Sequence, residues 1–233
     1  MASHEVYLRR EIVNIGRKMA NRGFVCATEG NISCALEDGT FLITPSGKNK
    51  GELGPAEILK INSRGEKISG WGKPSSETAM HLKVYQLRKD VKGVVHAHPP
   101  TLIAFSLAGI SLAGCVIPEI VMALGKVPSV GYATPGTGEA SVIIEGPIQE
   151  FNALLLDFHG SLTVGSSLEE AYYHLERIEQ AAKITWMARQ LGDIRSLPPG
   201  ERERLDQMRL IHQGKLPPGC NQCGLCPKGK TQI

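Results

Sequence analysis

Long apolar runs are missing from this sequence of 233 residues. None reaches the roughly 18 consecutive apolar residues that a membrane-spanning helix needs, so we expect no association with a membrane. The first five residues, Met1 to Glu5, do not have the basic-then-apolar profile of a secretory signal. We therefore expect a cytoplasmic protein.

A strong excess of one charge is also missing, since 26 Lys and Arg stand against 23 Asp and Glu. The net charge of +3 comes from one end: residues 195–233 carry +4, and the rest of the chain carries −1. A basic surface over the whole domain, as nucleic-acid-binding proteins have, is not expected. A partner-binding or nucleic-acid-binding module limited to residues 195–233 is an alternative, but that segment has no aromatic residue.

Cysteine is limited to six residues, and without a secretory signal we do not expect a disulfide framework. Three of them are scattered singly, Cys26, Cys34 and Cys115. The others form a C-x-x-C-x-x-C pattern near the C-terminus, Cys220, Cys223 and Cys226. This pattern resembles part of an iron–sulfur run but lacks a fourth thiolate. Two interpretations stay open: an additional metal site, or a flexible, redox-sensitive tail.

Hydrophobic residues at 42% and charged residues at 21% indicate a globular domain. Helical spacing predicts helices over residues 4–22, 77–89 and 101–107, and a long one after a Ser167/Glu170 capping box to about 191. Apolar runs between glycine-rich turns predict strands at 41–44, 58–62, 67–69, 91–98, 153–157 and 162–164. Since strands and helices do not alternate regularly, we expect an α/β sandwich around one sheet.

A break at Leu197-Pro198-Pro199-Gly200 predicts where the folded domain ends. We expect a catalytic domain over residues 1–197 and a basic, Pro- and Cys-rich tail over 198–233.

Two histidines stand two positions apart at the end of a predicted strand, in Val94-Val95-His96-Ala97-His98-Pro99. Alternate side chains of a strand share a face, about 6–7 Å apart, so one metal ion could lie between them. His159 ends another apolar segment, and three histidines with an open fourth position are the ligand set of a catalytic zinc. The alternative is that these are structural or turn histidines. The other histidines, His4, His81, His174 and His212, stand among polar helical residues, so we expect them on the surface.

Three short polar segments could bind an anion. Ser75 and Ser76 precede a predicted helix, where free backbone N–H groups and hydroxyls suit an anion, although plain N-capping is the commoner use. Residues 28–33 and 44–47 are similar glycine-containing segments, and neither matches a dinucleotide or Walker motif. Lys48 and Lys73 flank two of the segments and are expected on the surface. We therefore expect backbone N–H groups and hydroxyls to do most of the binding.

Six short motifs follow one another along the chain. They are Gly-Asn-x-Ser (30–33), Thr-Pro-Ser-Gly (44–47), Pro-Ser-Ser-Glu (74–77), His-x-His-Pro (96–99), Tyr-Ala-Thr-Pro-Gly-Thr (132–137) and His-Gly (159–160). In this order and spacing they resemble the class II aldolase/adducin family, and within it the L-fuculose-1-phosphate aldolases. The resemblance covers roughly residues 5–190.

The resemblance implies a single three-layer α/β/α domain around a mixed sheet. It implies one zinc ion per subunit, held by His96, His98 and His159. Glu77 matches the acid/base residue, which in the family can also bind the zinc before substrate arrives. The residues that match the loops for the substrate phosphate are Gly30, Asn31, Ser46, Gly47, Ser75 and Ser76. A homotetramer with active sites at subunit boundaries is also implied.

The implied activity is a zinc-dependent aldolase that cleaves a ketose 1-phosphate to dihydroxyacetone phosphate and an aldehyde through an enediolate. The fuculose aldolases have a tyrosine, contributed by a neighbouring subunit, in the stretch that matches residues 118–122, where this sequence has only Glu119 as a titratable group. Two interpretations of Glu119 stay open: a substitute for that tyrosine, or a solvated carboxylate in a turn. Their C-terminal tyrosine has no counterpart either. Alternatives on the same site are 4-epimerisation of a pentulose phosphate and dehydration of a thioribulose phosphate. A metal-free scaffold, as in the adducin branch, is the non-enzymatic alternative.

Overall fold

The computed structural model describes residues 2–112, 117–198 and 200–213. Within these residues one mixed sheet of eight strands has the order β4-β3-β2-β1-β5-β8-β7-β6. Neighbouring strands are antiparallel except β6 and β7, which are parallel. The strands are β1 (Asn31–Ala35), β2 (Phe41–Ile43), β3 (Leu59–Ile61), β4 (Lys67–Ser69), β5 (Gly93–Ala97), β6 (Ser129–Val130), β7 (Ala153–Leu156) and β8 (Gly160–Gly165).

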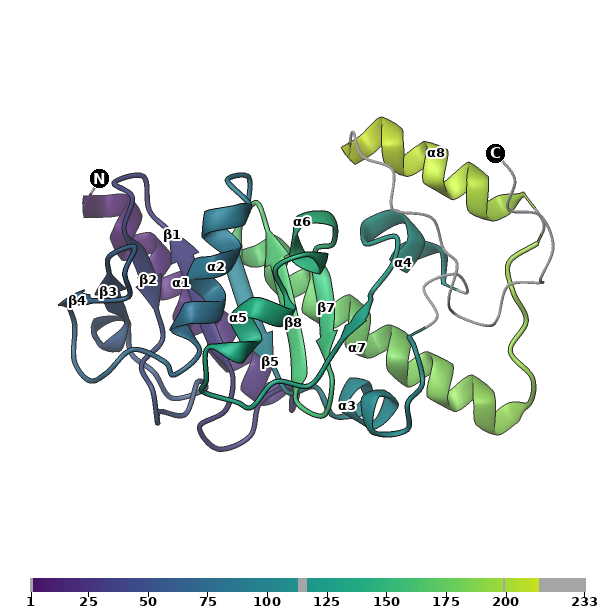
Figure 1. The fold of residues 1–233 in the computed structure, drawn as a ribbon, viewed down its shortest axis with the longest axis horizontal. Coiled ribbons are helices and arrows are strands. Elements are labelled where there is room, and N and C mark those ends of the chain that lie inside the picture. The colour runs from purple at the N-terminus through teal and green to yellow at the C-terminus, as the bar shows by residue number, and fades with distance from the viewer. Residues whose placement is uncertain (1, 113–116, 199, 214–233) are drawn as a thin grey trace.

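Helices cover both faces of the sheet, which confirms the expected three layers (Figure 1). On one face lie α1 (Ala2–Asn21), α3 (Pro100–Leu107), α4 (Pro118–Ala123) and α7 (Leu168–Leu191). On the other lie α2 (Thr78–Leu87), α5 (Glu139–Ile143) and α6 (Pro147–Glu150). A 3₁₀ turn, η1 (Pro55–Glu57), precedes β3, and α8 (Glu201–Gln213) packs against α4. No helix of the described part is both long and apolar enough to cross a membrane.

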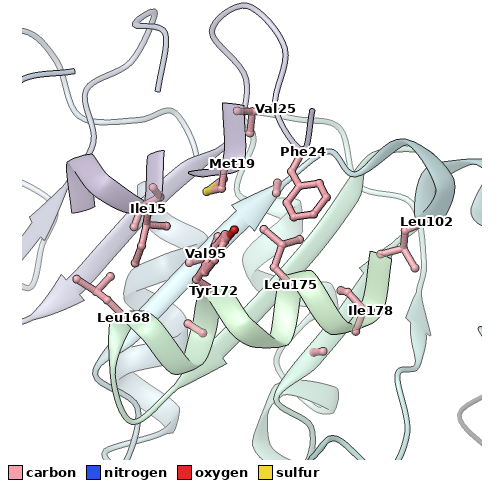
Figure 2. Packing of buried hydrophobic residues seen from close by; sticks show 14 of the residues in the cluster. Ile15, Met19, Phe24, Val25, Val95, Leu102, Leu168, Tyr172, Leu175 and Ile178 are labelled. Atoms are coloured by element: carbon pink, nitrogen blue, oxygen red, sulfur yellow. The ribbon is translucent and has the colours of Figure 1, made fainter. Parts of the chain in front are cut away.

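The larger core lies between α1, α7 and the sheet (Figure 2). Tyr172, Leu175 and Ile178 recur at helical spacing on α7 and pack towards Val95 of β5. The predicted start of this helix is confirmed, because the Ser167 hydroxyl accepts a hydrogen bond from the Glu170 N–H at 3.0 Å. This core fixes β5, whose end carries the predicted metal ligands.

The second core lies on the opposite face, against α2, α5 and α6. Val94 belongs to this core and Val95 to the first, because successive side chains of a strand point to opposite faces. β5, β7 and β8 are buried along their whole length. The polar side chains on the central strands are therefore placed by packing on both sides.

Two expectations from the sequence were wrong. The segment containing Asn31 and Ser33 is strand β1 and not only a loop, since its polar side chains alternate with the buried Ile32 and Cys34. His81 and His174 are buried and not on the surface. Both histidines have polar neighbours in the sequence, which suggested that their side chains are exposed. On their helices, however, the two side chains face the sheet.

Several predictions fall on parts that the structure leaves undescribed. The pattern Cys220, Cys223, Cys226 lies outside the described residues, as do Cys115 and the side chain of His212. α8 lies within the predicted tail, and its Arg209 is only 6% exposed. The domain boundary at residue 197 stays a prediction.

Candidate active site

The site forms where β1 begins and β5 ends. The antiparallel register of these two central strands pairs Asn31 with His96. Gly30 precedes β1 with a φ of +70°, and a Cβ at this position would lie 2.9 Å from the His96 carbonyl oxygen. A left-handed backbone that passes so close to a neighbouring strand requires glycine. The loop before β1 is thereby held against the end of β5.

The three histidines predicted as metal ligands come together here. His96 is on β5, His98 follows that strand, and His159 lies in the turn between β7 and β8. Pairing of β5 with β8, which sets His96 opposite Leu162, brings the turn beside the strand end. The ring centroids are 4.9, 4.7 and 4.8 Å apart. One nitrogen of each ring lies within 4.8 Å of the other two.

A hydrogen bond fixes which nitrogen of His96 faces the other two rings. His96 Nδ1 donates to the Ser161 carbonyl at 2.9 Å, which assigns its proton to Nδ1 and a lone pair to Nε2. His96 Nε2 and His98 Nε2 are 3.0 Å apart. Burial is the main reason why the pKa values of His96, His98 and His159 lie below the usual range. Three neutral imidazoles with converging nitrogens fit a divalent metal.

Glu77 lies against the histidines, directly before α2, and is 8% exposed. One carboxylate oxygen accepts a hydrogen bond from Asn31 Nδ2 at 2.7 Å and lies 3.2 Å from His96 Nε2. The other, Oε1, lies 3.5 Å from His159 Nε2 and has no hydrogen-bond partner among the described residues. Burial raises the pKa of Glu77, but His96, Asn31 and His159 together outweigh it and hold the pKa below its usual range. A buried, ionised carboxylate with an unsatisfied oxygen further favours a cation at this place.

A cavity of about 320 Å³ opens beside the cluster. Nine of the ten predicted site residues line it: Gly30, Asn31, Ser46, Gly47, Ser75, Ser76, Glu77, His98 and His159. The tenth, His96, is fully buried. The loops are joined by a hydrogen bond from the Ser46 N–H to the Lys73 carbonyl and by a bridge between Pro45 and Pro74. The structure therefore places the two predicted parts of the site, histidine cluster and polar loops, around one space.

The family match covers this whole arrangement. Residues 10–186 match the profile of the class II aldolase and adducin N-terminal domain. The chain belongs to the class II aldolase/adducin family. This confirms the resemblance found in the six motifs, and with it the expected fold and enzyme class.

Relatives within the family differ in the reaction that they carry out. The chain is 36% identical over 195 residues to a 3-oxo-tetronate 4-phosphate decarboxylase of Pectobacterium atrosepticum, covering 82% of this chain and 88% of the relative. It is also 36% identical over 199 residues to a 5-deoxy-D-ribulose 1-phosphate aldolase of Bacillus thuringiensis serovar kurstaki, covering 84% and 92%.

Solved structures of family members agree with this picture. YgbL of Escherichia coli, assigned three alternative activities (aldolase, epimerase or decarboxylase), superposes with a TM-score of 0.80 at 35% identity, covering 86% of this chain and 98% of that one. An L-fuculose 1-phosphate aldolase superposes with a TM-score of 0.77 at 30% identity, covering 86% and 94%. These comparisons show the family and the fold. The reaction has to be inferred from the geometry of the site.

The titratable residue of the stretch 118–122, Glu119, lies at another cavity. Glu119 lines a separate space of about 700 Å³ between α4 and α7, together with Arg22 and Arg177. It does not line the cavity beside the histidines. In this chain Glu119 and Glu77 therefore line different cavities.

His81 is a residue of the site that the sequence analysis missed. It is fully buried on α2, one turn after Glu77. Its Nδ1 is 2.7 Å from the Ser33 hydroxyl, which is 2.8 Å from the Tyr85 hydroxyl. Burial lowers the pKa of His81 to about 3, so the ring is neutral. The spacing Glu77, His81, Tyr85 is a four-residue repeat along one helix face, and this signal could have placed His81 inwards.

Proposed function

We propose that this chain is a zinc-dependent lyase that cleaves a ketose 1-phosphate to dihydroxyacetone phosphate and an aldehyde. The observation that carries the proposal is the shared cavity: the His98, His159 and Glu77 side chains line the same space as the Ser46 and Ser75 loops. In a ketose 1-phosphate the bond that is cleaved and the phosphate group are only a few bonds apart. Residues suited to each therefore have to lie at one cavity, as they do here.

His96, His98 and His159 would hold the zinc ion, with Glu77 as a further ligand before substrate arrives. When bound, such a metal acts as a Lewis acid that stabilises the negative charge of an enediolate, so no Schiff-base lysine is needed. Burial of His96 and its bond to Ser161 orient the ligand nitrogens in advance. Preorganised donors of this kind are the usual requirement for stabilising charge that develops in a transition state.

Glu77 would carry the proton. Its carboxylate accepts the proton of the hydroxyl on the carbon that is released, and it can return a proton to the enediolate carbon. Asn31 orients this carboxylate through the 2.7 Å hydrogen bond. The depressed pKa keeps Glu77 ionised at neutral pH, which suits a group that begins the cycle as a base.

Gly30, Asn31, Ser46, Gly47, Ser75 and Ser76 would hold the phosphate group. The amino-terminal end of α2 lies at this part of the cavity, and free N–H groups of a helix start favour anions. One of the hydroxyls has a second role, because Ser75 Oγ accepts a hydrogen bond from the Glu77 N–H at 3.3 Å. Ser75 thus connects the phosphate loop to the position of the acid/base residue.

Decarboxylation of a 3-oxo acid 4-phosphate is the second candidate. Relatives at 36% identity carry this activity, and residues 118–122 contain no tyrosine that could assist an aldehyde oxygen. Loss of CO₂ requires no proton transfer from a hydroxyl on the departing carbon, so it needs one acid/base group fewer. Both reactions leave the same enediolate of dihydroxyacetone phosphate.

Product analysis separates the candidates. The zinc-loaded protein is incubated with a panel of ketose 1-phosphates and with 3-oxo-tetronate 4-phosphate, and dihydroxyacetone phosphate, aldehyde and CO₂ are measured. An aldolase releases an aldehyde with the triose phosphate, and a decarboxylase releases CO₂. An epimerase or dehydratase gives no triose phosphate. A protein that binds no metal and turns over none of these compounds would be a scaffold, and the proposal would be wrong.

We also propose that the protein is a cytoplasmic homotetramer with active sites at subunit boundaries. Tyr132 and Phe158 support a boundary here, because they form an aromatic pair beside His159 and remain 58% and 62% exposed. Sedimentation measurements of the full chain test the assembly.

A further inference from the structure

Lys50 is buried under the polar loops of the site, although lysine is among the residues least often buried. It is 2% exposed. Helix α1 packs directly on it, since a Cβ at Gly16 would lie 2.3 Å from the Lys50 carbonyl oxygen. The glycine at position 16 thus lets the helix approach and cover the lysine. The burial of Lys50 therefore results from the packing of α1 and not from the side chain folding back over the surface.

The ammonium group of Lys50 joins two of the loops that surround the cavity. Its Nζ donates to the Thr28 carbonyl and to the Lys48 carbonyl, both at 2.6 Å. Thr28 precedes Gly30 and Asn31, and Lys48 follows Gly47. The distance between two segments predicted to bind the phosphate is therefore set by one side chain.

The described part of the chain gives this ammonium group no direct counter-charge. No carboxylate there forms an ion pair with Nζ, and two of its three N–H groups have carbonyl partners. Burial lowers the pKa of Lys50 to about 8, although the more distant Glu29 and Glu77 favour its charged form. A buried ammonium without an anion is costly, so its retention calls for a negative ligand.

The cavity provides the place for that ligand. Lys50 is the only lysine or arginine among the described residues that line it, whereas Glu29 and Glu77 add two negative charges. A phosphate dianion held only by neutral N–H groups and hydroxyls would be repelled by the Glu29 carboxylate, and by Glu77 wherever a metal does not offset its charge. One buried cation beneath the loops offsets this repulsion, more strongly than a solvated surface lysine could.

We propose that Lys50 is the cationic part of an anion subsite for a phosphate monoester: it fixes the two loops through Thr28 and Lys48 and directs its remaining N–H to the phosphate. The inference rests on the proposed function, because the phosphate is taken to belong to the substrate. It replaces the expectation that neutral groups do most of the binding.

The test compares Lys50→Met with Lys48→Met and with the parent protein, all loaded with zinc. Lys48 is the matched control, since it flanks the same loop but its side chain is 59% exposed. Binding of inorganic phosphate is measured by calorimetry, together with kcat and KM for the phosphorylated substrate that the parent cleaves. Zinc content and thermal unfolding report on metal binding and folding.

We expect Lys50→Met to bind phosphate about 10–100-fold more weakly and to raise KM by a similar factor, the range for losing a hydrogen bond to a charged group. The zinc content should stay at the parent value, Lys48→Met should match the parent, and Lys50→Arg should recover part of the affinity. A folded, zinc-loaded Lys50→Met that binds phosphate as the parent does overturns the inference. If Lys50→Met does not fold, a crystal structure of the parent with inorganic phosphate decides: a phosphate oxygen within hydrogen-bond distance of Nζ supports the inference, and a phosphate bound elsewhere refutes it.

The two proposals fail in different ways. If the parent releases dihydroxyacetone phosphate but Lys50→Met is unaffected, the lyase function stands and the role of Lys50 is wrong. If no substrate is cleaved but phosphate binding depends on Lys50, the subsite stands and the lyase function is wrong.

Discussion

The two ends of the site are built by different means. At the histidine end, side chains on or beside the buried strands β5 and β8 point their nitrogens inwards, and His96 is locked by the Ser161 carbonyl. At the end proposed to bind the phosphate, called the anion end below, glycine-containing loops present the backbone, with Gly30 and Gly47 at φ values of +70° and +68°. Strands place side chains, and left-handed loops expose N–H groups. Side-chain substitutions should therefore abolish function at the first end and weaken it by degrees at the second.

The largest effect is expected from His96→Ala. The buried ring supplies one of three converging nitrogens, and its removal leaves too few ligands for a tightly bound zinc. Zinc content by mass spectrometry should fall to background, together with the release of dihydroxyacetone phosphate. His4→Ala, on the exposed part of α1, serves as control. Full zinc occupancy in His96→Ala would show that the ligand set is different.

Glu77→Gln should separate metal binding from proton transfer. The three histidines suffice as ligands, whereas an amide cannot accept the proton, so we expect zinc to be retained and kcat to fall about 10²–10⁴-fold. Glu52→Gln, an exposed acidic residue, is the control. A near-normal kcat in Glu77→Gln would assign the base to another group.

The histidine end could be predicted from sequence because its signal is local. His96 and His98 are two apart on a strand, and His159 follows an apolar run. The sequence does not reveal how these elements meet. β5 pairs with β8, and the hydrogen bond from His96 to the Ser161 carbonyl joins residues 65 positions apart. The family resemblance provided that long-range information, and the structure bears out the cluster.

One residue now proposed for the anion end was not predicted from the sequence. Ser46 and Ser75 belong to recognisable loops, but Lys50 looks like any surface lysine in the run Lys48-Asn49-Lys50. Its burial depends on α1, which packs on it at Gly16, more than thirty positions earlier in the chain. His81 was missed for a similar reason, since its burial depends on contact between α2 and β1. Whether such a polar side chain is buried depends on tertiary packing, which the neighbouring residues in the sequence do not reveal.

The double change Ser75→Ala and Ser76→Ala tests the graded loss expected at the anion end. It removes up to two hydrogen bonds to a charged group, each worth roughly 1.5–3 kcal/mol, so kcat/KM should fall on the order of 10²-fold or more. The loss should be larger with the phosphorylated ketose than with the free ketose, because only the first also loses the phosphate contacts, while zinc content stays unchanged. Equal discrimination between the two compounds by mutant and parent would move the phosphate away from these hydroxyls.

Ser167→Ala should have the smallest effect, because it touches neither end of the site. The Ser167 hydroxyl caps α7 by accepting the Glu170 N–H at 3.0 Å, and replacing such a cap by alanine typically costs about 1 kcal/mol. For a chain of this size the thermal midpoint should fall by roughly 2–4 °C. Ser166→Ala is the matched control: its hydroxyl donates to the Glu170 carboxylate, but the exposed Ser166 N–H keeps the same partner, so a smaller shift is expected. In both variants zinc content, phosphate affinity and kcat should equal those of the parent. If Ser167→Ala instead lowered kcat or zinc occupancy, α7 would be coupled to β5 closely enough to position the histidines, and the histidine end could no longer be treated as fixed by its strands alone.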